Sequence, residues 1–103
     1  DPLLLQKKAL LVALGADEAV IESGVEVAAR AQHVIDRALA ATGDVALVAH
    51  GHYLRVLAAT WLGLPPEDGR MFDLGTGTYC VLGFEHEYRT VIRWNAPGPE
   101  SSA

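Results

Sequence analysis

The 103-residue sequence is poor in cysteine and in long apolar runs. Its single cysteine, Cys80, excludes an internal disulfide and is typical of a protein from a reducing compartment. The longest unbroken apolar run, Ala9–Leu14, is far shorter than the roughly 18 residues that a membrane-spanning helix needs. No basic segment followed by an apolar run and a cleavage site opens the chain. We therefore expect a cytoplasmic protein with no membrane partner.

Basic residues are also scarce. The sequence has 8 Lys and Arg against 13 Asp and Glu, which gives a formal net charge of −5. Proteins that bind nucleic acid without sequence preference gain affinity by neutralising phosphates with Lys and Arg, so this balance argues against a nucleic-acid partner. Apolar residues, in contrast, make up 50% of the chain and charged ones only 20%. The chain therefore has the composition of one folded domain or less.

Two helices are predicted in the first half of the sequence. Asp1 and Pro2 are residues that start helices, and leucines then recur at helical spacing up to a stop at Gly15. The second predicted helix begins with the capping-box spacing of Ser23 and Glu26 and carries one apolar stripe down to Gly43.

The second half is predicted to contain strands around a third helix. Residues 44–49 form a short apolar run without alternation, which favours a strand buried on both faces of a parallel sheet. A helix follows at once and ends at Gly63. Residues 78–84 and 90–95 are rich in β-formers, and the short link between them predicts a hairpin. The predicted order is ααβαββ, which is an α/β layer fold.

The junction between this first strand and the third helix is the strongest candidate site. His50 stands at the carboxyl end of the predicted strand, the edge at which open α/β sheets bind ligands. The N–H groups at a helix start attract phosphate, and Gly51 leaves room for an oxygen to approach the backbone. An imidazole here could clamp phosphate, shuttle a proton or act as a nucleophile. An exposed turn histidine without a role is the alternative that the residues alone leave open.

Residues 48–57, which read Val-Ala-His-Gly-His-Tyr-Leu-Arg-Val-Leu, resemble the second histidine motif of the histidine phosphatase superfamily, which includes the phosphoglycerate mutases. Glu22 and Ser23, followed by Val27 and Arg30, resemble the family's Gly-Glu-Ser segment with its catalytic acid. Three further segments are similar to small bacterial phosphatases of the family: Trp61-Leu-Gly-Leu-Pro65, Gly77-Thr78 and Trp94-Asn-Ala-Pro97. The resemblance runs from Glu22 to Pro97.

This resemblance implies a partial phosphoglycerate mutase-like fold with three α/β/α layers and a small mixed sheet. It implies phosphoryl transfer with a small phosphorylated metabolite or phosphate as partner, and no metal or other cofactor. His50 would stabilise the phosphoryl group as charge develops. Glu22 would donate a proton to the leaving oxygen, which requires a raised pKa. His50, Gly51 and His52 would bind the phosphate.

The sequence departs from the family in one decisive respect. The family's nucleophile is the histidine of an N-terminal Arg-His-Gly motif, and no Arg-His-Gly occurs in these 103 residues. We therefore interpret residues 22–97 as the C-terminal half of the domain, residues 1–21 as a helix and linker without family resemblance, and residues 98–103 as a disordered tail. The chain is a phosphatase or mutase only if another segment or chain supplies the nucleophile. The alternative is a catalytically inactive truncated or remnant fragment that self-associates.

The missing segment also predicts an unpaired strand. In the family, the strand that ends at the second histidine lies beside the strand with the nucleophile, so here it would lose its neighbour. A buried backbone group without a partner costs about 1–3 kcal/mol. We therefore expect this edge to pair with another copy in a homo-oligomer, with a complementing N-terminal half, or with the chain's own rearranged hairpin.

Other chemically active side chains have simpler interpretations. The His50-x-His52 pair could chelate zinc or copper, but no third ligand is evident, so we assign no metal site. His33 is expected on a solvated helix face and His86 in the hairpin turn. Cys80 is expected in the core. The glycines and threonines of residues 75–78 suggest phosphate binding, but they precede a strand and not a helix, so a turn that leads into a strand is the favoured interpretation. The resemblance leaves the alternative open, because members of the family carry a similar segment near the active site.

Overall fold

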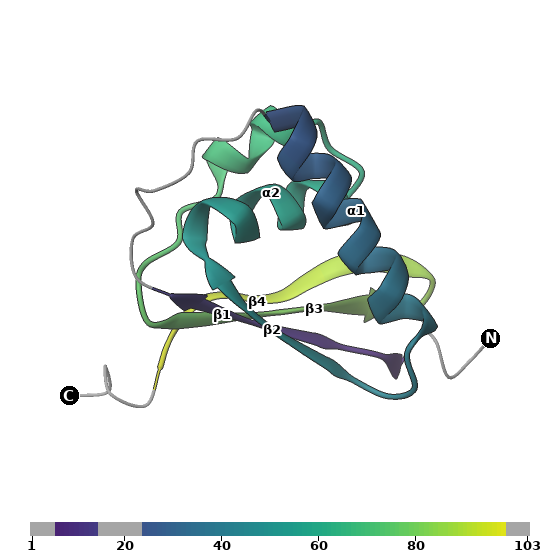
Figure 1. Ribbon diagram of the computed structural model, residues 1–103. Helices are drawn as coiled ribbons and strands as arrows, with labels where there is room; N and C mark the ends of the chain where they lie inside the picture. The colour runs from purple at the N-terminus through teal and green to yellow at the C-terminus, as the bar shows by residue number, and fades with distance from the viewer. Residues whose placement is uncertain (1–5, 15–23, 99–103) are drawn as a thin grey trace.

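The computed structural model describes residues 6–14 and 24–98 of the chain, as a sheet covered by two helices (Figure 1). The elements in chain order are β1 (Ala9–Leu14), α1 (Gly24–Ala40), β2 (Val45–His50), α2 (Gly51–Trp61), the 3-10 helix η2 (Pro66–Met71), β3 (Thr78–Glu85) and β4 (Tyr88–Pro97). The small mixed sheet and the α/β class agree with the sequence prediction. In this part of the chain, neither helix has the length and apolar character needed to cross a membrane.

The four strands lie in the order β2-β1-β3-β4. β1 runs parallel to β2, whereas β3 is antiparallel to both β1 and β4. β3 and β4 form the predicted hairpin, with Glu85 paired to Tyr88 across its turn. His86 occupies this turn with a positive φ of 55°. The first and second halves of the chain therefore share one sheet, in which β1 is a central strand.

The prediction of a helix over residues 1–14 is wrong for the part of this segment that forms β1. Leucine and alanine are good helix formers, but a strand inserted between β2 and β3 buries them more completely. Leu11 and Ala13 are only 1% and 3% exposed on the helix-covered face of the sheet. Tertiary pairing thus overrides local helix propensity, and the described order is βαβαββ instead of ααβαββ. Residues 1–5 lie outside the described residues.

The predicted strand at residues 44–49 is confirmed as β2, but its predicted unpaired inner edge is wrong. β1 pairs with β2 along all six residues, from Ala9↔Val45 to Leu14↔His50. The prediction of burial on both faces is also wrong, because Val48 is 55% exposed. β2 is the outermost strand of the sheet among the described residues, and no described helix covers the face on which Val48 lies.

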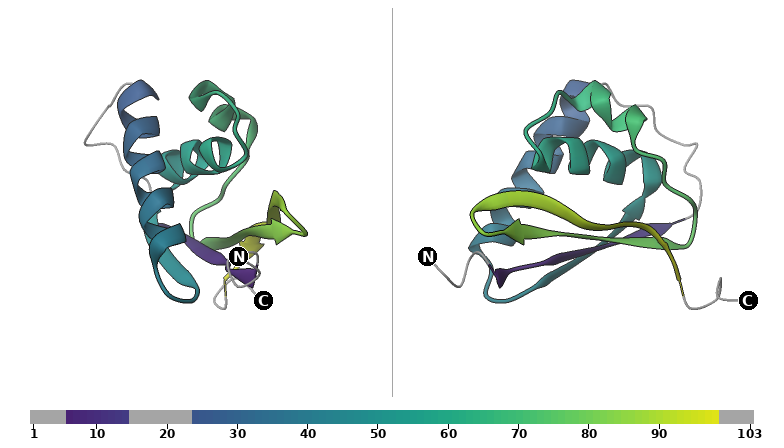
Figure 2. Two further views of the ribbon diagram at one scale, coloured as in Figure 1. Left: turned by 90° about the vertical axis from the view of Figure 1, so that its right-hand side faces the viewer. Right: turned by 180° about the vertical axis from the view of Figure 1, so that it is seen from behind.

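Both helices cover the same face of the sheet (Figure 2). α1 buries the stripe of Val27, Ala31 and Ile35, which confirms the predicted amphipathic helix, although the helix ends at Ala40 before Gly43. Ser23, predicted as its capping residue, lies outside the described residues. The opposite face of the sheet carries Leu10, Val48 and Ile92, which are 39%, 55% and 45% exposed. The described residues therefore supply two layers of the expected three-layer fold.

α2 is the most deeply buried helix of the described residues, and a 3-10 helix follows it. Leu54 is completely buried, and Trp61 is 6% exposed where the helix ends. Residues 66–71, which follow it, form η2. Gly69 in η2 lies so close to α2 that a Cβ would be 3.0 Å from the carbonyl carbon of Arg55. A residue without a side chain at this position therefore allows η2 to pack directly against the backbone of α2.

A lysine side chain caps the carboxyl end of α1. The Nζ of Lys7 donates to the carbonyl oxygens of Ala38 at 2.8 Å and Leu39 at 3.0 Å, and it also contacts the carbonyl oxygen of Ala41. Ala38 and Leu39 belong to the last turn of the helix and Ala41 follows it directly, so these carbonyls lie at the negative end of the helix dipole. The ammonium therefore ties the start of β1 to the end of α1.

Substitution of Lys7 by alanine is expected to lower the free energy of unfolding by about 1–3 kcal/mol, because it removes charge-assisted hydrogen bonds to these carbonyls. Chemical denaturation of the variant and the wild-type chain measures the difference. Lys8→Ala is the matched control, since Lys8 is exposed and bonds to Asp44 through its backbone N–H alone. An equal loss in the free energy of unfolding for Lys7→Ala and Lys8→Ala would contradict a capping role for Lys7.

Candidate functional site

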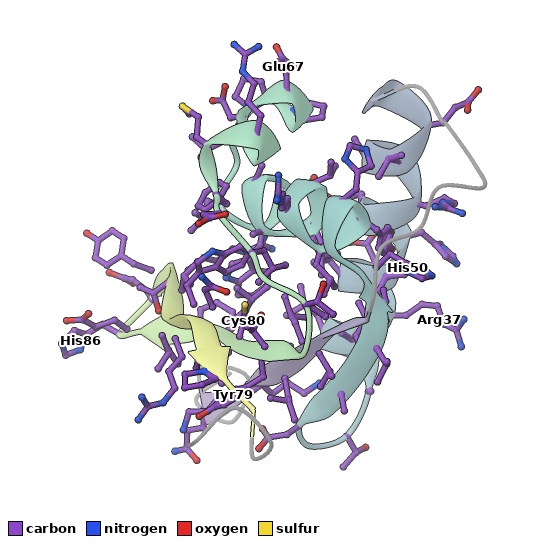
Figure 3. All side chains as sticks on the ribbon, turned by 90° about the vertical axis from the view of Figure 1, so that its left-hand side faces the viewer. Arg37, His50, Glu67, Tyr79, Cys80 and His86 are labelled. Atoms are coloured by element: carbon purple, nitrogen blue, oxygen red, sulfur yellow. The ribbon has the colours of Figure 1, made fainter. Side chains whose placement is uncertain are left out.

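The β2–α2 junction places His50 at the carboxyl end of β2 (Figure 3). His50 is the last residue of β2 and the N-cap residue of α2, with φ −76° and ψ 154°. Its side chain makes no capping hydrogen bond to the helix, so the imidazole is not used to close the helix start. The N–H groups at a helix start are suited to bind an anion, and the His50 side chain does not cap them here. This confirms the predicted strand-to-helix position of His50, which is half-buried.

Gly51 begins α2 directly behind His50. Among the described residues, a Cβ at this position would have only the Cδ2 atom of Leu74 near it, at 4.0 Å. The described part of the chain therefore leaves room beside the backbone at the helix start. His52, the third residue assigned to phosphate, is exposed on the first turn of α2. Glu22, the predicted proton donor, lies outside the described residues.

The carboxyl end of β1 lies beside His50. In the parallel pairing of β1 and β2, Leu14 and His50 are register partners. Neighbouring strands are about 4.8 Å apart, so residue 14 is the closest position that the sheet offers to residue 50 on a neighbouring strand. β1 thus takes the place, next to the strand of the second histidine, that the resemblance gives to the strand of the nucleophile.

The loop of residues 73–77, which precedes β3, lies at the same edge of the sheet. The N–H of Gly77 donates to the carbonyl oxygen of Ala13 at 3.0 Å, which fixes the loop to the end of β1. Its other end packs the buried Leu74 against the start of α2 at Gly51. The sequence predicts a strand-entry turn here, and phosphate binding by residues 75–78 is the alternative that their glycines and threonines suggest.

A ring contact joins the two helices next to this edge. The Cζ atom of Arg30, on α1, lies 5.3 Å from the centroid of the Tyr53 ring, on α2. Tyr53 is one helical turn beyond His50, so the guanidinium is held near the helix start by a cation–π contact. Arg30 is one of the residues on which the family resemblance rests, and the contact gives the α1–α2 pair a fixed positive charge on this side.

The remaining predicted candidates lie away from the site. Figure 3 shows His86 at the hairpin tip, on the opposite side of the molecule from His50. His33 is exposed on α1, as predicted. Among the residues that the structure describes, no three His, Cys, Asp or Glu side chains gather in a group that could hold a metal ion.

Cys80 is a core residue, as predicted, and not part of the site. Its side chain is fully buried, and its Sγ accepts a hydrogen bond from the backbone N–H of Asn95 at 3.3 Å. Burial raises the pKa of the Cys80 thiol, and the Asn95 bond offsets part of this increase. The neutral thiol is therefore favoured, which is the opposite of what a nucleophilic cysteine requires.

Comparison with known proteins agrees with this geometry. The sequence profile of the histidine phosphatase superfamily (branch 1) matches residues 8–97, so the chain belongs to this superfamily. An acid phosphatase from Mycobacterium tuberculosis (strain ATCC 25618 / H37Rv) is 36% identical over 70 residues, which are 66% of this chain and 34% of the relative.

Solved structures show the same fold. The Mycobacterium tuberculosis protein of open reading frame Rv3214 superposes with a TM-score of 0.72 at 33% identity, over 75% of this chain and 41% of its own. The mycobacterial glucosyl-3-phosphoglycerate phosphatase Rv2419c gives a TM-score of 0.64 at 27% identity, over 75% of this chain and 45% of its own.

The chain thus spans about a third of the curated relative and less than half of each of these structures. The profile match begins at residue 8, earlier than the resemblance read from the sequence, and it includes β1. Residues 8–21 are therefore within the family match, in contrast to the prediction that residues 1–21 lack family resemblance.

Proposed function

We propose that the β2–α2 edge binds the phosphoryl group of a small phosphomonoester, and that the protein is a phosphoryl-transfer protein of the phosphatase or mutase type. The observation that carries this proposal is the position of His50, at the carboxyl end of a parallel strand and at a helix start that its side chain does not cap. An imidazole and helix amides converging on one point are complementary to phosphate oxygens. The relationship to an acid phosphatase and to a glucosyl-3-phosphoglycerate phosphatase supports the substrate class.

In this proposal the residues have separate tasks. His50 stabilises the charge that develops on the phosphoryl oxygens, and the backbone at Gly51 with the helix start receives them. His52 lies at the edge of the phosphate site. Glu22 donates a proton to the leaving alcohol oxygen. A nucleophile that attacks phosphorus comes from another segment or chain, because the sequence contains no Arg-His-Gly.

Binding of inorganic phosphate to the purified chain tests the proposal. His50→Ala is expected to weaken phosphate binding at least about tenfold, since a lost hydrogen bond to a charged group is worth about 1.5–3 kcal/mol. Isothermal titration calorimetry measures the dissociation constant. His86→Ala serves as the control, because His86 lies at the hairpin tip on the opposite side of the molecule. Unchanged affinity in His50→Ala, or no phosphate binding by the wild-type chain, would refute the proposal.

A second candidate is a catalytically inactive fragment that self-associates or pairs with a complementing N-terminal half. Two observations favour it: residue 14, the register partner of His50, is a leucine, and the uncovered sheet face exposes Leu10, Val48 and Ile92. Exposed apolar side chains on a sheet without a covering layer favour association. Light scattering on the purified chain measures its mass in solution. A monomer at all concentrations would contradict self-association.

A further inference from the structure

The loop at the carboxyl edge of the sheet is held by several hydrogen bonds. The N–H of Gly75 donates to Oδ1 of Asn95 at 2.8 Å, and the hydroxyl of Thr78 donates to the carbonyl oxygen of Gly75 at 2.7 Å. The indole N–H of Trp94 bonds to the carbonyl oxygen of Asp73. Asn95 itself has a positive φ of 58°, which turns its side chain out of the regular β4 pattern. The loop is therefore fixed to β4 and does not need a ligand to become ordered.

The same loop reaches from the end of β1 to the start of α2. At one end, the Gly77 N–H bonds to the carbonyl oxygen of Ala13, whose register partner on β2 is Ala49, next to His50. At the other end, Leu74 lies 4.0 Å from the position of a Cβ at Gly51. The two anchors thus lie on either side of the edge at which His50 stands. The residues between them therefore lie at the same end of β1 and β2 as His50.

Thr76 is the side chain between these anchors that can act as a ligand. Its neighbours in the loop are Gly75 and Gly77, which carry no side chains. Thr76 is exposed, and its hydroxyl bonds to none of the described residues, whereas the hydroxyl of Thr78 is used within the loop. A hydroxyl donates one hydrogen bond and accepts others, so it can bind a phosphate oxygen that the amides of α2 leave free.

We propose that Thr76 is a substrate-binding residue, whose hydroxyl donates a hydrogen bond to an oxygen of the phosphoryl group held at His50. This inference rests on the proposed function. It adds a third contact to the phosphoryl group, from the loop before β3, to those proposed for His50 and for the start of α2. The rigid loop supports it, because a side chain on a pre-ordered segment loses little conformational entropy when a ligand binds. The hydroxyl adds no charge and instead fixes the orientation of the phosphoryl group between the loop and the helix start.

Substitution of Thr76 by valine tests the proposal, because valine keeps the shape and removes the hydroxyl. Thr76→Val is expected to raise the dissociation constant for inorganic phosphate about tenfold, whereas Thr76→Ser retains the hydroxyl and stays within about twofold of the wild-type chain. Thr42→Val is the matched control, since Thr42 is exposed in the loop before β2, at the other end of the sheet. Thermal unfolding of each variant is measured alongside to show that the fold is unchanged.

The outcomes separate this inference from the proposed function. If His50→Ala weakens phosphate binding and Thr76→Val does not, the role of Thr76 is overturned and the proposed function stands. If Thr76→Val and Thr76→Ser lose affinity equally, the effect does not come from the hydroxyl and the proposal is again overturned. If the wild-type chain binds no phosphate, both proposals fail.

Discussion

Substitution of Trp61 by alanine is expected to lower the free energy of unfolding by about 3–5 kcal/mol, a large part of the 5–15 kcal/mol that stabilises a domain. The side chain joins α2 to the hairpin. Its indole N–H donates to the carbonyl oxygen of Thr90 at 3.1 Å, and its ring meets Phe84 edge-on at a centroid distance of 5.2 Å. The Cζ atom of Arg89 lies 4.4 Å from the ring centroid, and an Nη1–H of Arg89 donates to the Trp61 carbonyl oxygen at 3.3 Å.

Chemical denaturation of two further variants shows which of these contacts matters. Trp61→Phe keeps an aromatic ring beside Phe84 and loses the indole donor, so it is expected to cost less than the alanine variant. Tyr88→Ala removes an aromatic ring that is 70% exposed and should change the free energy of unfolding by less than about 0.5 kcal/mol. A Trp61→Ala variant as stable as Tyr88→Ala would show that the helix and the hairpin are not coupled through this side chain.

Substitution of Leu14 by histidine is expected to raise the rate of phosphomonoester hydrolysis at least about tenfold above the wild-type chain, which corresponds to about 1.4 kcal/mol in the activation barrier. The position is chosen because residue 14 is the register partner of His50 at the proposed phosphate edge. An imidazole nitrogen introduced there can attack phosphorus while the alcohol oxygen leaves with a proton, and water then hydrolyses the phosphohistidine. Release of nitrophenol from p-nitrophenyl phosphate measures the rate, and mass spectrometry detects phosphate on residue 14.

Leu10→His is the matched control for this gain of function. Leu10 lies on the same strand, four residues before Leu14. Its register partner on β2 is Ala46 instead of His50. A histidine at position 10 is therefore on the sheet but away from the carboxyl edge, and it should leave hydrolysis at the wild-type level. Equal rates in the two variants would contradict the catalytic interpretation of the edge and favour the inactive fragment.

The strand-to-helix position of the candidate site could be predicted from the sequence, whereas the central strand of the sheet that carries it could not. The position of His50 follows from a short valine-rich strand followed at once by helical spacing, and both signals are local. β1 was not predictable in the same way, because the choice between helix and strand for Ala9–Leu14 depends on pairing with segments far along the chain. Leucine and alanine are good helix formers, so the local propensity of this segment favoured a helix and not the observed strand.

The position of the loop before β3 could not be predicted from the sequence either. Its position depends on the Gly77 bond to Ala13 and on the Asn95 side chain, which come from opposite ends of the sequence. No periodicity connects these residues. The exposed state of Val48 also escaped prediction, because an apolar run without alternation looks the same in a central strand as in an outer strand with one face open.

The pairing of β1 has a consequence for how the molecule assembles. β1 must find β2 on one side and β3 on the other, and both partners are synthesised long after it. The β3–β4 hairpin and the continuous β2–α2 segment need only short loops to close, so they can form early. Pairing of β1 with β2 and with β3 closes much longer loops. We therefore expect insertion of β1 to be the slowest of these pairing steps. Until it occurs, β2 and β3 present adjacent vacant edges to any other extended segment nearby.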